Sequence, residues 1–113
     1  QAEEGIRHVE RSRWLGDVYK RQGCISVTGN ILPRLCSEMQ HAWMEGNLHK
    51  AMQMHQKLMP VHAAMFCETS PGPVKYAAEL LGFSSSEARL PITDIADSSK
   101  KQVEEALKGV GAL

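Results

Sequence analysis

The feature that most constrains this chain is one short β-branched run at residues 24–28, Cys-Ile-Ser-Val-Thr, which Gly29 and Asn30 end. Alternating β-branched residues are typical of a strand, and no other segment predicts one. A buried strand must pair its backbone N–H and C=O groups with neighbouring strands. Its apolar composition fits a parallel sheet covered on both faces. We therefore expect a strand whose partners lie outside this sequence, at one end of a larger α/β protein.

A helix is predicted directly after this strand, over residues 31–46. Asn30 can cap its start, Pro33 is tolerated in the first turn, and Gly46 closes it. Its expected inner face consists of Leu35, Met39, Ala42 and Trp43. Strand, tight loop and helix together make one βα unit.

A second helix is expected from Asn47, which is a good N-cap residue. Pro60 should kink it near residues 56–60, because an internal proline removes a backbone hydrogen bond. The expected buried stripe is Leu48, Met52, Met59 and Phe66, extended by His55 and His62.

Two further helices are predicted beyond the breaker at residues 70–73, Ser-Pro-Gly-Pro. The first is short and stops at Gly82, and an extended connector at 89–92 follows it. The last begins near residues 97–99, with Ser99 and Gln102 at capping-box spacing. Its expected inner face is Val103, Ala106, Leu107 and Val110.

Charge and cysteine usage exclude several classes of partner. Thirteen basic and 13 acidic residues cancel, so no basic field favours nucleic acid or anionic lipid. The 3 cysteines contain no C-x-x-C pair, which argues against a disulfide framework or structural zinc and favours a reducing, cytoplasmic compartment. No apolar run reaches the ~20 residues of a membrane span.

Residues 1–22 differ from the rest, because they crowd basic residues without any helical or strand period. Within them, residues 14–22 resemble adapter sequence translated from an assembled read. We interpret residues 1–22 as a doubtful, non-native segment and expect the true start of the protein to lie upstream.

Residues 23–30, Gly-Cys-Ile-Ser-Val-Thr-Gly-Asn, resemble the last barrel strand of the dihydrodipicolinate synthase family, which usually reads G-x-I-S-V-T-[AG]-N. The resemblance continues through Leu58-Met-Pro-Val-His62, Phe66-Cys-Glu68, Pro73-Val-Lys-Tyr-Ala77, Leu80-Leu-Gly82, Arg89-Leu-Pro91 and Ala106-Leu-Lys-Gly-Val-Gly111. It implies a parent with a TIM barrel of the class I aldolase type, (β/α)8. Residues 23–46 would be its last strand and helix, and 47–113 its C-terminal helical domain, which helps to build a homotetramer.

The same resemblance implies a lyase of lysine and diaminopimelate biosynthesis that needs no cofactor. Such an enzyme joins pyruvate to L-aspartate 4-semialdehyde through a Schiff base on a lysine. Ile25 would bind substrate through its backbone, while the Schiff-base lysine and the proton-relay tyrosine lie upstream in the family. The fragment alone is therefore expected to hold no catalytic residue and to be inactive. The family motif N-P-I-P-V-K is altered here, because Ser70 and Gly72 replace its asparagine and isoleucine.

Several alternatives stay open on the sequence alone. Lys75 could act as a nucleophile if desolvated, but the resemblance assigns it to a helix. His55 and His62 lie two helical turns apart, ~10 Å, too far for ordinary joint metal coordination. Related pyruvate aldolases, namely N-acetylneuraminate lyases and sugar-acid aldolases, share the barrel. In a third alternative the chain is a stand-alone helical module whose methionine-rich stripes bind a partner.

Overall fold

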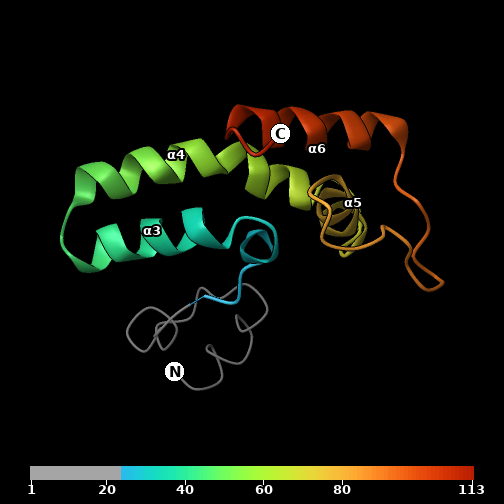
Figure 1. Cartoon of the computed structure of the whole chain (residues 1–113), viewed down its shortest axis with the longest axis horizontal. Helices are drawn as coiled ribbons and strands as arrows, with labels where there is room; N and C mark the ends of the chain where they lie inside the picture. Colours follow the sequence, from blue (N-terminus) through green and yellow to red (C-terminus); the bar gives the residue numbers. More distant parts are fainter. Residues whose placement is uncertain (1–23) are drawn as a thin grey trace, which may run out of the picture.

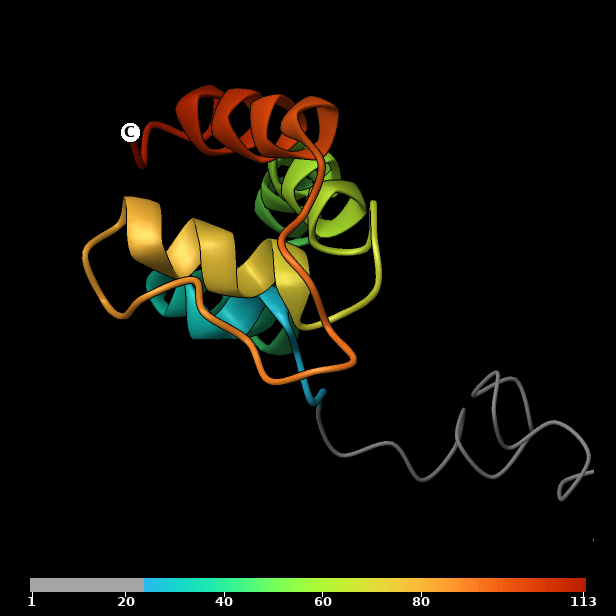
Figure 2. The same ribbon diagram turned by 90° about the vertical axis from the view of Figure 1, so that its right-hand side faces the viewer.

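Helices make up nearly all the regular structure of residues 24–113, the part of the chain that the computed structural model describes. A 3-10 turn η2 (Thr28–Asn30) precedes α3 (Pro33–Met44), α4 (Leu48–Met65), α5 (Gly72–Leu80) and α6 (Asp97–Gly109). Figure 1 shows α3 and α4 side by side as a hairpin, with α6 lying along the C-terminal part of α4. The turned view in Figure 2 shows α5 below α6, with the connector 81–96 looping outward between them. The predicted mostly helical fragment is therefore confirmed.

One core joins α4, α5 and α6 with Ile31 and Leu32, and part-buried side chains of α3 pack against it. Leu58, Met65, Val103 and Leu107 are among its largest fully buried side chains, each at most 1% exposed. The other buried members are Ile31, Leu32, Val61, Ala64, Ala77, Ala106 and Val110. The inner face predicted for α6, including Val103 and Leu107, is thereby confirmed. This core fixes α4 rigidly against α6.

The strand predicted at 24–28 is not confirmed. Cys24, Ile25 and Ser26 have no regular structure, and Thr28 already belongs to η2. A strand needs a neighbouring strand to pair with its backbone N–H and C=O groups, and residues 24–113 supply none. The side chain of Ile25 is accordingly fully exposed.

Helix starts differ from the predictions at two of three N-caps. Asn30 does not cap α3, which begins two residues after Ile31; its amide donates instead to the carbonyl oxygens of Ser26 (3.4 Å) and Val27 (3.0 Å). The cap at Asn47 is confirmed, because its Oδ1 accepts a bond from the N–H of Lys50 (3.1 Å).

The capping box predicted at the start of α6 is wrong. The helix begins at Asp97, and its N-cap Ala96 has no side-chain acceptor to offer. Ser99 therefore lies inside the first turn, where its side chain is buried. An acidic residue at the helix start, Asp97, favours this register through the helix dipole.

The buried stripe predicted for α4 is also wrong. Leu48, Met52, Met59 and Phe66 are each 50–62% exposed. The face turned to the core carries Ala51, Leu58, Val61, Ala64 and Met65. Helix α4 has two apolar faces, and the alanines on the core face allow α3 and α6 to approach closely.

Helix α4 continues through Pro60, and Figure 1 shows its ribbon changing direction in the last turns, as a proline predicts.

Helix α5 meets the connector at its first residue. A Cβ placed on Gly72 would lie 2.8 Å from Cγ2 of Ile95, so the two segments touch through the missing side chain. The helix ends as predicted at Gly82, whose φ of +76° suits glycine. The connector therefore begins after the C-terminal end of α5 and returns to contact its N-terminal end through Ile95.

Candidate functional site

Residues 24–30 form a short hooked segment that leads into the helical unit. The N–H of Gly29 donates to Oγ of Ser26 (3.1 Å), and the amide of Asn30 donates to the carbonyls of Ser26 and Val27. These bonds lie on the C-terminal side of Ile25, the one residue to which the sequence assigns a substrate contact. That role stays a prediction.

The hook is fastened to α4 by one side-chain pair. Oγ1 of Thr28 and Nδ1 of His62 lie 2.6 Å apart, and which of them donates depends on the tautomer of the imidazole. Thr28 is 1% exposed, so its hydroxyl has little access to water. Burial, reinforced by the nearby His55, lowers the pKa of His62 and favours the neutral ring. Sequence patterns did not predict this pair, because they placed His62 on the apolar stripe of α4 and related it only to His55.

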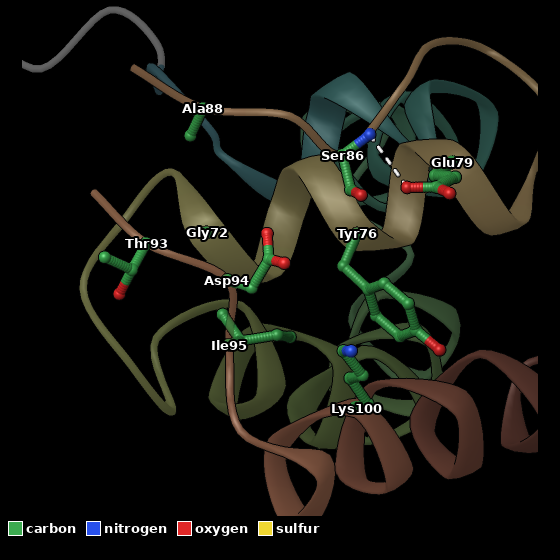
Figure 3. Close-up of a pocket in the computed structure, with 9 residues that line it drawn as sticks. All are labelled: Gly72, Tyr76, Glu79, Ser86, Ala88, Thr93, Asp94, Ile95 and Lys100. Carbon is green, nitrogen blue, oxygen red and sulfur yellow. Dashed lines mark hydrogen bonds between the residues drawn. The ribbon is translucent and has the colours of Figure 1, made fainter. Parts of the chain in front are cut away.

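A small polar pocket lies elsewhere, between α5, the connector and the start of α6. Figure 3 shows Tyr76 pointing from α5 toward α6, with Lys100 beside its ring. The Lys100 ammonium lies 5.8 Å from the ring centroid and 3.8 Å from Oδ1 of Asp97. On the far side, Oε2 of Glu79 accepts a bond from the N–H of Ser86 (2.8 Å). The polar groups around this pocket contact one another across α5, the connector and α6, which makes the pocket a joint between these segments.

The shortest hydrogen bond of that joint links Tyr76 to Glu104. The phenol donates to Oε1 of Glu104 at 2.7 Å. This bond, with smaller contributions from burial and neighbouring carboxylates, raises the pKa of Tyr76 to about 12. The bond therefore persists at neutral pH and ties α5 to α6.

Replacing this phenol tests the joint. Tyr76→Phe is expected to lower the free energy of unfolding by about 1 kcal/mol at pH 7, because a part-buried hydrogen bond to a charged group is lost. The folded state holds this proton more tightly than the unfolded state, so the stabilisation is present below pH 10 and disappears as pH rises through about 12. Urea titrations at pH 7 and 11 should show the gap between wild type and variant closing. A gap that widens at pH 11 would contradict this account.

The other candidate residues are not brought together. Lys75 lies on α5 and does not line the polar pocket, and His55 is exposed on α4. Within residues 24–113 no three His, Cys, Asp or Glu side chains lie close enough to hold a metal ion. Cys24, Cys36 and Cys67 are free thiols, and burial raises the pKa of Cys36. No helix of this part is long and apolar enough to cross a membrane.

The hook and the four helices form one packed helical unit, whose polar side chains Thr28, His62, Tyr76 and Glu104 connect its segments. The chain belongs to the dihydrodipicolinate synthetase family, whose model matches residues 19–110.

Known proteins agree with this membership. The 4-hydroxy-tetrahydrodipicolinate synthase of Gluconacetobacter diazotrophicus is 52% identical over 92 residues, which are 81% of this chain and 31% of that protein. A solved structure of a monomeric dihydrodipicolinate synthase variant superimposes with a TM-score of 0.78 at 38% identity, covering 80% of this chain and 30% of that one. The Acinetobacter baumannii enzyme, solved with pyruvate, gives a TM-score of 0.75 at 34% identity, covering 80% and 31%. This chain thus spans about a third of the length of its relatives.

Proposed function

We propose that this chain is the C-terminal part of a 4-hydroxy-tetrahydrodipicolinate synthase, a lyase of lysine and diaminopimelate biosynthesis. In the whole enzyme, a lysine upstream of residue 23 condenses with pyruvate, with loss of water, and the adduct then joins L-aspartate 4-semialdehyde. The observation that carries this proposal is the 52% identity over 92 residues with an enzyme of that name. The names of the related sequences favour this second substrate over those of N-acetylneuraminate lyases and sugar-acid aldolases.

In this proposal residues 23–28 become the eighth strand of a (β/α)8 barrel once the seventh and first strands lie beside them. Helix α3 is then the eighth barrel helix, and residues 47–113 form the C-terminal domain. Substrates of such barrels bind at the C-terminal ends of the strands, and Ile25 lies within this strand, three residues before its last residue Thr28. Ile25 contacts pyruvate through its backbone, so its side chain is free to pack between sheet and helices.

The exposed apolar stripe of α4 supports the proposal that the rest of the enzyme packs against this chain. Its members Leu48, Met52 and Met59 and the C-cap residue Phe66 follow one another at spacings of four, seven and seven residues, along one face of the helix. Monomeric proteins seldom leave so continuous an apolar surface in water. The remainder of the enzyme, as a homotetramer in the cytoplasm, supplies the cover; the three free thiols suit a reducing compartment.

A chimera tests the proposed function. Residues 23–113 would replace the matching C-terminal part of the Gluconacetobacter diazotrophicus enzyme, leaving its upstream two-thirds unchanged. We expect the chimera to condense pyruvate with L-aspartate 4-semialdehyde at a rate within about tenfold of the unmodified enzyme, while the upstream part alone is inactive. A chimera that folds and binds pyruvate, yet accepts only a sugar aldehyde, would contradict the choice of substrate.

The location of the nucleophile can be tested on both proteins. Pyruvate and borohydride should leave the 113-residue chain unlabelled and should reduce an adduct onto one upstream lysine of the chimera. Peptide mass spectrometry identifies the labelled residue. A pyruvate adduct on Lys75 in the chain alone would show that the nucleophile had been assigned wrongly.

A further inference from the structure

We infer that His62 is a positioning residue, which fixes through Thr28 the backbone of residues 25–28 against the substrate. The inference rests on the proposed function, because it concerns the binding of pyruvate beside Ile25. Beyond the proposed function, the inference gives the helical domain a direct part in setting the geometry of the barrel strand.

Thr28 is the point at which the hook becomes fixed. Its carbonyl oxygen accepts bonds from the N–H groups of Ile31 (3.1 Å) and Leu32 (2.9 Å), and its side chain bonds His62. The residues before it, Cys24 to Ser26, have no regular structure. Thr28 is therefore held from the backbone and from the side chain at once, three residues beyond the proposed substrate contact.

His62 is able to hold this point because the helix that carries it is packed into the core. Its neighbours Val61, Ala64 and Met65 are completely buried in the core that joins α4 to α6. The separation of 2.6 Å is short for a hydrogen bond and leaves little freedom between the two side chains. A shift of α4 would thus move Thr28 with it.

Position matters because catalytic geometry tolerates little error. A hydrogen-bonding contact weakens when its donor or acceptor is displaced, because the bond requires a narrow range of distance and angle. If the backbone at Ile25 binds pyruvate, loss of the bond at Thr28 should weaken pyruvate binding first. The chemistry, which an upstream lysine performs, should change less.

The test uses the chimera described above, with pyruvate as the probe. His62→Leu and Thr28→Val each delete one partner at nearly constant volume. His62→Asn keeps a polar nitrogen close to the position of Nδ1, and Thr28→Ser keeps the hydroxyl. His55→Leu, an exposed histidine two turns away on α4, is the matched control.

We expect His62→Leu and Thr28→Val to raise the KM for pyruvate about tenfold, with kcat changed less than about threefold. His62→Asn and Thr28→Ser should recover most of the loss, and His55→Leu should behave as the unsubstituted chimera. The double variant should be no worse than either single variant, since both remove one bond.

The inference is overturned if both deletions leave KM within about twofold of the unsubstituted value, or if they lower the thermal midpoint and the amount of active enzyme without changing KM. Thr28→Val, which is almost isosteric, decides the matter should His62→Leu not fold. An unsubstituted chimera that folds without any activity contradicts the proposed function itself, a result that no His62 variant can produce.

Discussion

Leu107→Ala is expected to lower the free energy of unfolding of the 113-residue chain by about 3 kcal/mol, enough to abolish a cooperative transition in a marginal fragment. Leu107 lies on α6 and is completely buried in the core that it shares with Leu58, Met65 and Val103. Truncation removes the Cγ methine and both Cδ methyl groups and leaves a cavity, because the surrounding helices relax only partly. Urea unfolding followed by circular dichroism at 222 nm, a wavelength sensitive to helix, measures the loss.

Leu48→Ala is the matched control for this experiment. The same side chain is removed from a helix, but at a position that is 55% exposed. Its effect on the isolated chain should stay below about 1 kcal/mol. Equal losses in the two variants would mean that the core does not lie between α4 and α6.

Ile25→Pro in the chimera is expected to lower kcat/KM for pyruvate by more than about a hundredfold, since a proline inside a regular element costs about 3 kcal/mol or more and each 1.36 kcal/mol is a factor of ten. The proposed contact uses the backbone, and proline removes the N–H that would pair with a neighbouring strand. Steady-state kinetics with pyruvate as the varied substrate measure the effect.

Ile25→Val separates the backbone from the side chain. Valine keeps the N–H, the carbonyl and the β-branch, so kcat/KM should stay within about twofold of the unsubstituted chimera. If valine were as damaging as proline, the side chain of Ile25 and not its backbone would carry the contact.

Local patterns predicted the helices well because short-range physics decides them. The Asn47 cap, the stop at Gly82 and the apolar face of α6 each depend on residues within a few turns. The strand at 24–28 failed for the opposite reason, since a strand is stabilised by partners that another part of a protein must supply. The sequence did indicate this requirement, because the strand was expected to pair with strands outside residues 24–113.

Helix α4 shows a second limit of pattern reasoning. Its large apolar residues were expected inside, yet the core face uses Ala51 and Ala64 beside Leu58 and Val61. Periodicity identifies an apolar face but does not say which of two faces meets the neighbouring helices. The contact between Thr28 and His62 was beyond reach for the same reason, because residues 34 positions apart meet only through tertiary packing.

The close approach of Gly72 to Ile95 makes these two positions a volume pair. The motif N-P-I-P-V-K carries isoleucine where this chain has Gly72, and even one added carbon would collide with Cγ2 of Ile95. A large residue at 72 thus requires a smaller one at 95 or a displaced connector. The space beside the start of α5 is therefore filled by Ile95 of the connector, and a side chain at position 72 could enter it only by displacing Ile95.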